Sequence, residues 1–215
     1  MTAPRTRRRS KLAPDPDVHR IIMSAATEAL REHGVRRLSV AAVLDRAELS
    51  TRAFYRHFDS KDHVIAAVFL DMARAESRRL HRKMSRAAGP VEAVAAWIDG
   101  RLDLAFDESI KSDLRRLSLE AQSQMFAAPE LIQPAFEEML TPLIDQLRRG
   151  LTDGVFHDVD PVSEARSIQG VVWSSTEQHW TAGGFERADV RRRALRFCLR
   201  GLGVQPDTID NIVRK

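Results

Sequence analysis

Apolar positions along the chain recur mostly at intervals of three and four residues, the spacing that places them on one face of a helix. The first such stretch follows Asp15, a capping residue type, and Pro16, which suits the first position of a helix. Gly34 marks the end of this helix. A second helix is predicted after the capping residue Ser39, and a third at Ser50–Phe58. The pattern therefore predicts three short helices at the start of the chain.

The remaining residues repeat the helical pattern and carry no hairpin signal such as Asn-Gly. Proline and glycine separate the segments, and a kink is predicted at Pro142. The C-terminal tip beyond these segments is predicted to be irregular. The predicted helices cover about residues 60–85, 90–106, 111–126, 134–152, 160–181 and 186–202. The expected fold class is all-α.

Charge is distributed unevenly along the 215 residues, which carry a formal net charge of +4. Residues 1–63 hold 13 basic and 8 acidic side chains, a balance of +5, whereas the rest has a balance of −1. A basic end on a neutral body is typical of nucleic-acid readers, although a membrane-surface or acidic-protein patch would look similar. We expect residues 1–14 to be a basic disordered arm, either a solvated tail or a contact to the DNA minor groove.

Several classes of protein are disfavoured by what the sequence lacks. The single cysteine, Cys198, predicts no intrachain disulfide, and the arginine-rich start is not followed by an apolar stretch of the signal-peptide kind. Charges interrupt every apolar segment, so no membrane helix is expected. Catalytic and phosphate-binding motifs are also missing, and Asp160 beside His157 is better explained as a helix cap than as a metal ligand. We therefore expect a cytoplasmic protein that is not an enzyme and uses no metal or cofactor.

The third predicted helix separates its side chains into two faces. Phe54 and Phe58 fall on the side that would pack, whereas Arg52, Tyr55 and Arg56 fall on the other. Arginine, tyrosine and threonine side chains can reach base edges and phosphates in a major groove. Any surface helix shows arginine outward and phenylalanine inward, so the face pattern alone does not decide the function. The short preceding helix and the local positive charge favour a helix-turn-helix.

These residues make the chain resemble the tetracycline-repressor (TetR) family of bacterial regulators. The similarity rests on a serine that opens the second helix, an alanine near its end, a serine before the third helix, and the Tyr-x-His-Phe ending. The residues concerned are Ser39, Ala47, Ser50, Tyr55, His57, Phe58, Ser60 and Lys61. The sequence departs from the family pattern at Glu48, where glycine is usual in the turn, and at Arg52, where small residues are frequent.

The resemblance implies a helix-turn-helix DNA-binding domain at residues 15–63 and an effector-binding and dimerisation domain at residues 64–215. It implies contacts to double-stranded DNA from both ends of the recognition helix and from the start of the next helix. A packed role for His57 and a partly structural role for Tyr55 remain open. The implied DNA-binding residues are Ser39, Ser50, Thr51, Arg52, Tyr55, Arg56, His57 and Lys61.

The resemblance also implies a cavity for a small-molecule effector in the larger domain. Bulky apolar side chains could line it, with a few polar ones orienting the ligand, although most of them would also suit an ordinary core. The apolar candidates are Trp97, Phe106, Met125, Phe126, Phe136, Met139, Trp173 and Trp180. The polar candidates are Glu120, Gln124, Gln169 and His179.

The predicted function is that of a homodimeric repressor that binds a palindromic operator and is released by a small-molecule effector. The last two predicted helices are the expected dimer interface, and we expect their arginines to be solvated or to form ion pairs at its rim. Activation instead of repression stays open. The alternative function is that of a helical adaptor or sequestration protein that binds a small molecule and no longer reads DNA.

Overall fold

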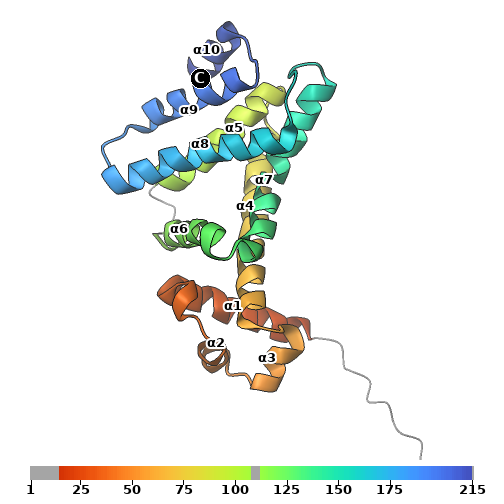
Figure 1. The fold of residues 1–215 in the computed structure, drawn as a ribbon, viewed down its shortest axis with the longest axis vertical. Coiled ribbons are helices and arrows are strands. Elements are labelled where there is room, and N and C mark those ends of the chain that lie inside the picture. The colour runs from red at the N-terminus through yellow and green to blue at the C-terminus, as the bar shows by residue number, and fades with distance from the viewer. Residues whose placement is uncertain (1–14, 108–111, 215) are drawn as a thin grey trace, which may run out of the picture. The chain divides into compact units, whose positions relative to one another are not determined.

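The computed structural model describes residues 15–107 and 112–214, and the chain divides into two compact units, one ending at Val68 and the other starting at Phe69. All regular elements in the described ranges are helical, as Figure 1 shows. This confirms the predicted all-α fold class. The arm predicted at residues 1–14 and the predicted helix start at Lys111 lie outside the described residues.

The first unit begins with α1 (Pro16–His33), whose start and end are both set by local chemistry. The Asp15 carboxylate accepts a hydrogen bond from the Asp17 backbone N–H at 2.9 Å, and Gly34 ends the helix with φ of 73°. The short 3-10 helix η1 (Val35–Arg37), which the pattern did not predict, follows directly.

Two short helices, α2 (Val40–Ala47) and α3 (Thr51–His57), complete this unit together with the start of α4 (Lys61–Met84). Both pack on the apolar face of α1. The buried residues of α1 that receive them are Ile22, Ala25, Ala26, Ala29 and Leu30.

The second unit contains the rest of α4 and six further helices. They are α5 (Pro90–Phe106), α6 (Ser112–Ala127), α7 (Pro129–Thr152), α8 (Pro161–Ala182), α9 (Arg187–Gly201) and α10 (Pro206–Arg214). Helix α5 contacts α7, α8 and α9 and is buried around most of its circumference, which makes it the centre of the unit.

Helix α7 starts five residues before the position predicted from the sequence. The prediction placed the start at Pro134, but the helix begins at Pro129 and runs through both Pro134 and Pro142. Pro129 stands in the first turn, where a missing N–H costs nothing. Ile132, ahead of the predicted start, is buried, so packing holds the extra turn in helical form despite the donor that Pro134 lacks.

The C-terminal tip was predicted to be irregular, and this was wrong. It forms α10, which packs on α9 through the buried Ile209 and Ile212. Two buried positions three residues apart are too short a pattern to signal a helix on their own. The Arg191 guanidinium also binds the carbonyl oxygens of Ile212 and Val213, which satisfies the end of α10.

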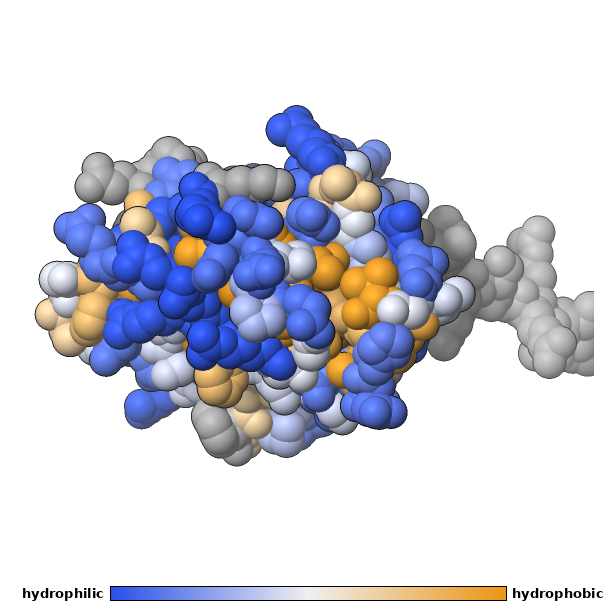
Figure 2. All heavy atoms as spheres, turned by 90° about the horizontal axis from the view of Figure 1, so that it is seen from above, coloured by the Kyte–Doolittle hydropathy of each residue, from blue (hydrophilic) through white to orange (hydrophobic). Residues whose placement is uncertain are grey.

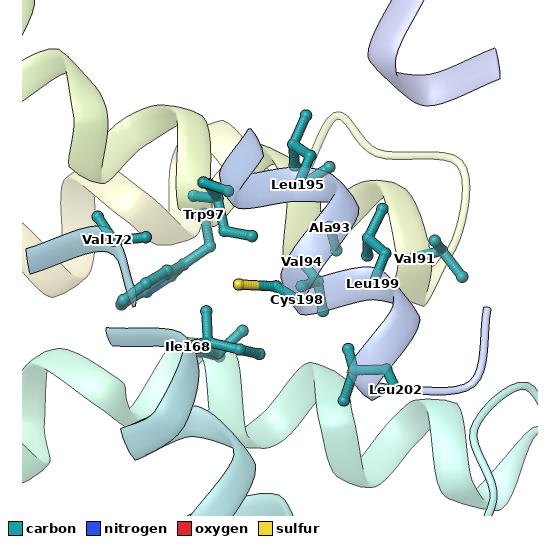
Figure 3. Close-up of a cluster of buried hydrophobic side chains, with 14 of the residues drawn as sticks. Val91, Ala93, Val94, Trp97, Ile168, Val172, Leu195, Cys198, Leu199 and Leu202 are labelled. Atoms are coloured by element: carbon teal, nitrogen blue, oxygen red, sulfur yellow. The ribbon is translucent and has the colours of Figure 1, made fainter. Parts of the chain in front are cut away.

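Cys198 lies in the main apolar cluster of the second unit, where α5, α8 and α9 meet (Figure 3). Its sulfur points toward the Trp97 ring, near Ile168 and Val172. Burial raises the pKa of the Cys198 thiol to about 12, so the thiol stays protonated near neutral pH and behaves as a small apolar side chain.

Candidate functional site

Two serine caps position the helices of the predicted helix-turn-helix. The Ser39 hydroxyl accepts a hydrogen bond from the Ala42 N–H at 3.1 Å, and the Ser50 hydroxyl accepts one from the Ala53 N–H at 3.3 Å. Both serines are exposed. Each hydroxyl proton therefore remains available to donate to a phosphate oxygen while the oxygen caps its helix.

The turn between α2 and α3 contains Glu48 in the left-handed region, with φ of 52° and ψ of 40°. Its N–H donates to the Asp45 carbonyl oxygen at 3.3 Å, and the Leu49 N–H donates to the Leu44 carbonyl oxygen at 3.1 Å. The glycine usual in the resembling family would adopt this conformation without strain, whereas a side chain there costs on the order of 1 kcal/mol. The helix-turn-helix geometry is thus kept without the glycine.

Helix α3 divides into the two faces predicted from its sequence. Phe54 and Phe58 are buried in the first unit, with ring centroids 5.9 Å apart, and the His19 ring of α1 stacks on Phe58 at 5.0 Å. On the other face Tyr55 is 54% exposed, and Arg52 and Arg56 are also exposed. The buried face fixes the helix so that the polar face meets solvent.

Thr51, Arg52, Tyr55 and Arg56 lie together on this outer face, which we name the reading face. Within the part of the chain that the structure describes, Arg52 and Arg56 form no ion pair. Their charges are available to an external anion. Arginine, tyrosine and threonine together supply the donors and the apolar methyl group that contact with DNA requires.

His57 and Lys61 are both partly exposed but differ in their surroundings. The His57 ring lies 6.0 Å from the His19 ring, and its Nδ1 atom is buried without a hydrogen-bond partner among the described residues. This contact favours a packing role for His57. Lys61 begins α4, where the positive end of the helix adds to its own charge.

An ion-pair cluster joins α2 to α1. The Arg46 guanidinium binds the Glu32 carboxylate and lies 3.8 Å from a Glu28 carboxylate oxygen. The hydrogen bond to Glu32 raises the pKa of Arg46 above its ordinary value. Arg46 is thereby committed to a structural contact, unlike Arg52 and Arg56.

The second unit contains a cavity of about 730 Å³, part of it open to solvent, between α4, α5, α6, α7 and α8. We call it the effector cavity, after the ligand that the resemblance implies. Of the residues predicted to bind a ligand, five line this cavity: Met125, Phe136, Met139, Gln169 and Trp173.

Other predicted ligand residues are placed elsewhere. Trp97 is fully buried in the apolar cluster around Cys198, because α5 is surrounded by other helices. Phe106 and His179 pack on each other, with ring centroids 4.0 Å apart. The side chain of Phe126 lies outside the described part.

The remaining predicted ligand residues make contacts of their own. The Gln124 amide donates to the Glu120 carboxylate at 3.3 Å. The Trp180 ring packs edge-on against Trp173, at 5.8 Å between centroids, beneath the Arg115 guanidinium. Of these residues, Glu120, Gln124 and Trp180 are not among those that line the effector cavity, whereas Trp173 is.

Glu76 and Arg101 line the cavity and were missed by the sequence analysis. Arg101 is 8% exposed, and its Nη1 atom donates to the Glu76 carboxylate at 2.9 Å. The sequence did contain a signal that Arg101 is buried. Arg101 lies four residues after Trp97 and four before Ala105, on an apolar face of α5. A charge on such a face is informative because buried charges are rare.

The pKa values of this pair reflect burial and mutual attraction. Burial raises the pKa of Glu76, but the Arg79 hydrogen bond and the Arg101 charge outweigh it, so the pKa lies below its ordinary value. Burial lowers the pKa of Arg101 and is only partly opposed by Glu76. The glutamate is therefore held in its ionised form beside a buried guanidinium.

Within residues 15–107 and 112–214, no group of three or more metal-ligating side chains is gathered closely enough to hold an ion. Among the helices in the same residues, none has the length and apolar character needed to span a bilayer.

Comparison with known proteins finds a family match in the first unit. The family described as "Bacterial regulatory proteins, tetR family" matches residues 22–68. An uncharacterised HTH-type transcriptional regulator of Mycobacterium tuberculosis is 40% identical over 55 residues, which are 26% of this chain and 26% of that protein. The match thus spans about a quarter of that relative's length.

Two other proteins resemble the chain over most of its length. The HTH-type transcriptional repressor KstR2 of Mycolicibacterium smegmatis is 21% identical over 186 residues, covering 84% of this chain and 88% of that protein. The crystal structure of the transcriptional regulator FadR from Bacillus subtilis in complex with stearoyl-CoA is 18% identical. It superimposes with a TM-score of 0.66 over 85% of this chain and 98% of that one, which shows a shared fold.

The local sequence match and the shared fold agree with the geometry of the first unit, in which serine caps, a left-handed turn and a buried phenylalanine pair hold α3. Residues 22–68, which hold most of this geometry, are thus similar in sequence to the tetR family of bacterial regulatory proteins.

Proposed function

We propose that this protein is a DNA-binding transcriptional regulator, a homodimeric repressor of a palindromic operator that a small-molecule effector releases. The observation that carries the proposal is the reading face of α3. Arg52, Tyr55 and Arg56 are exposed on a helix whose opposite side is anchored by Phe54 and Phe58. Such a helix can enter a major groove while its packed face stays in the protein.

The direct test is binding of the full chain to a DNA duplex that covers the region upstream of its own gene. Fluorescence anisotropy over a series of salt concentrations should give a steep negative slope of log affinity against log salt, because bound cations displace counterions from phosphates. A flat slope or no binding to this DNA would favour the alternative, a helical adaptor or sequestration protein that no longer reads DNA.

Substitutions on the reading face test whether α3 is the helix that binds. Arg52→Ala and Tyr55→Ala should each weaken binding by roughly tenfold or more, within the range expected for base and phosphate contacts. Both side chains are exposed, so the circular dichroism spectrum should not change. Arg82→Ala, at an exposed arginine near the end of α4, is the control and should bind DNA as the wild type does.

The effector cavity supports the second half of the proposal. FadR, with the same fold, has been crystallised with stearoyl-CoA. We infer that a ligand in the cavity of this chain favours one of two conformations and so changes the arrangement of the two recognition helices in the dimer. Adding a ligand that binds the cavity should then lower DNA affinity, while the Tyr55→Ala variant should still bind that ligand.

Dimer formation is proposed through α8 and α9. Phe197 of α9 is 68% exposed, an unusual position for so large an apolar side chain. In the view of Figure 2, hydrophobic residues show at the surface in several places among hydrophilic ones. Sedimentation should give a dimer for the wild type and a monomer for Phe197→Asp. Leu119→Asp, at an exposed leucine of α6, should remain dimeric.

Not all arginines of α9 are available to such an interface. Arg191 was expected to be solvated or at an interface rim, but its side chain is only 16% exposed and its Nε atom donates to the Asp99 carboxylate at 2.7 Å. Arg196 binds Asp210 of α10 at 2.8 Å. Arg191 is thus bound within the unit by α5 and by the end of α10, and Arg196 is bound by α10, which was not predicted.

A further inference from the structure

Two side chains that line the effector cavity each have a buried polar atom without a partner. These atoms are the Nε atom of Arg101, on α5, and the Oε1 atom of Gln169, on α8. Arg101 is 8% exposed and Gln169 is 4% exposed, and neither atom has a hydrogen-bond partner among the described residues. Buried donors and acceptors are nearly always paired in folded proteins, so two exceptions on one cavity need an explanation.

The charge balance beside Arg101 favours an anionic partner. The Glu76 carboxylate accepts hydrogen bonds from both Arg101 and Arg79. The bond from the Arg79 Nε atom is 2.7 Å long. Asp103 is shared by Arg79 at 3.6 Å, Lys83 at 2.7 Å and Arg187 at 2.8 Å. Four cations thus surround two carboxylates, and only Arg101 among the four lines the cavity. Glu76 also lines the cavity, but Arg79 pairs with it as well, so the charge of Arg101 is only partly neutralised and can attract a carboxylate in the cavity.

The rest of the wall is suited to an apolar body. Phe136, Met139, Met125 and Trp173 face the same space, and methionine and aromatic side chains adapt to flat or irregular apolar ligands. The cavity therefore joins an apolar wall to one unpaired donor and one unpaired acceptor.

We infer that the effector cavity binds an apolar carboxylic acid, whose carboxylate accepts from Arg101 Nε and whose hydroxyl or N–H group donates to Gln169 Oε1. The inference rests on the effector site of the proposed function and names the chemical class of its ligand. It assigns Arg101 and Gln169 as binding residues. The competing explanation is a purely structural pair, in which Arg101 serves only to neutralise Glu76.

The first test compares carboxylates with alcohols of the same skeleton by calorimetry on the full chain without DNA. The pairs are benzoate with benzyl alcohol, 2-naphthoate with 2-naphthylmethanol, and decanoate with 1-decanol. In at least one pair the carboxylate should bind about tenfold more tightly, as expected for a charge-assisted hydrogen bond in a buried site. If no carboxylate binds more tightly than its alcohol, the inference is wrong.

Substitution of Arg101 tests which side chain causes this preference. Arg101→Met should abolish the carboxylate preference and leave alcohol binding within about twofold. Because this change leaves Glu76 without one of its partners, the Arg101→Met, Glu76→Gln double variant removes both charges and provides a folded alternative. Lys83→Met is the control, since Lys83 belongs to the charge cluster but does not line the cavity, and it should keep the preference. A preference that survives in the double variant would overturn the assignment of Arg101.

The donor half of the inference is tested with hydroxylated 2-naphthoates that carry the hydroxyl at positions 5, 6 or 7. One of them should bind the wild type roughly fivefold more tightly than 2-naphthoate, and Gln169→Leu should remove that gain without changing 2-naphthoate affinity. If no isomer gains affinity, or if the gain survives in Gln169→Leu, Gln169 is not a binding residue.

These outcomes are separate from the test of DNA binding. A carboxylate preference in a chain that fails to bind DNA would refute the regulator and keep the ligand class. Salt-dependent DNA binding without any carboxylate preference would keep the regulator and refute the ligand class.

Discussion

The two units of this protein carry their candidate sites in opposite ways. In the first unit the reading face points outward, and Phe54 and Phe58 anchor it from behind. In the second unit the polar groups of interest, Arg101 and Gln169, are buried and face a cavity. The first site needs a rigid support and a free surface, whereas the second needs an interior that is left incompletely packed.

This difference explains why substitutions should act differently in the two units. A side chain on the reading face can be removed at little cost to folding, since few protein contacts depend on it. A side chain on the cavity wall takes part in the core or in the charge cluster, so its removal affects folding and binding together. The following predictions test this contrast.

The largest effect is expected at Phe54, directly beside Tyr55 in the sequence. Phe54→Ala should lower the free energy of unfolding by about 3–5 kcal/mol, because a fully buried ring is replaced by a cavity. Tyr55→Ala should change it by less than about 1 kcal/mol. Urea denaturation measures both. Equal losses for the two variants would mean that α3 does not separate into a packing face and a reading face.

Glu76 should show how far the second unit depends on its buried charges. Glu76→Gln should cost about 3 kcal/mol at pH 7, because the buried Arg101 loses its ionised partner. The pKa of Glu76 is lower in the folded state than its ordinary value of 4.5. Its stabilisation is therefore complete above that value and is lost as pH falls through the folded-state pKa.

The measurement for Glu76 is the free energy of unfolding of both proteins between pH 7 and pH 3. The gap between wild type and Glu76→Gln should narrow as the solution becomes acidic. Glu130→Gln, at an exposed glutamate of α7, should show no such gap. A gap that stays constant with pH would show that the charge of Glu76 does not matter.

Gly150 tests how tightly the second unit is packed away from its cavity. A Cβ atom at this position would overlap the ring of the buried Phe156, so Gly150→Ala should cost about 1–3 kcal/mol. Gly170→Ala, in α8, meets open space and should stabilise the helix by up to about 1 kcal/mol. Thermal unfolding of the two variants should shift in opposite directions, and a shared direction would contradict the packing described for Gly150.

The smallest effect is expected at the left-handed turn. Glu48→Gly should raise the free energy of unfolding by roughly 0.5–1 kcal/mol, because glycine adopts positive φ without strain. Asp158, in the second unit, has a similar φ of 53°, and Asp158→Gly should give a gain of the same sign. Thermal unfolding would measure both gains. A loss in Glu48→Gly would show that the Glu48 side chain makes a contribution larger than the backbone strain.

Much of the helical layout was readable from the sequence, because the signals that start and stop helices are local. Asp15 and Ser39 act as the predicted caps, and Gly34 ends α1 as predicted. Ser50, where the third helix was predicted to begin, also caps it. The separation of Phe54 from its exposed neighbours on α3 follows from helical period alone. Local signals fail where tertiary packing overrides them. The predicted helix bounds were therefore wrong at the start of α7 and at α10.

The effector cavity, in contrast, was decided by tertiary structure. Apolar residues that line a cavity and apolar residues that fill a core follow the same helical spacing, so the pattern could not separate Met139 from Trp97. Whether Arg101 reaches solvent, a glutamate or a ligand depends on helices far apart in the sequence. The sequence by itself thus determined the helices and the outward face of α3, whereas only their packing determined which buried groups meet around an open space.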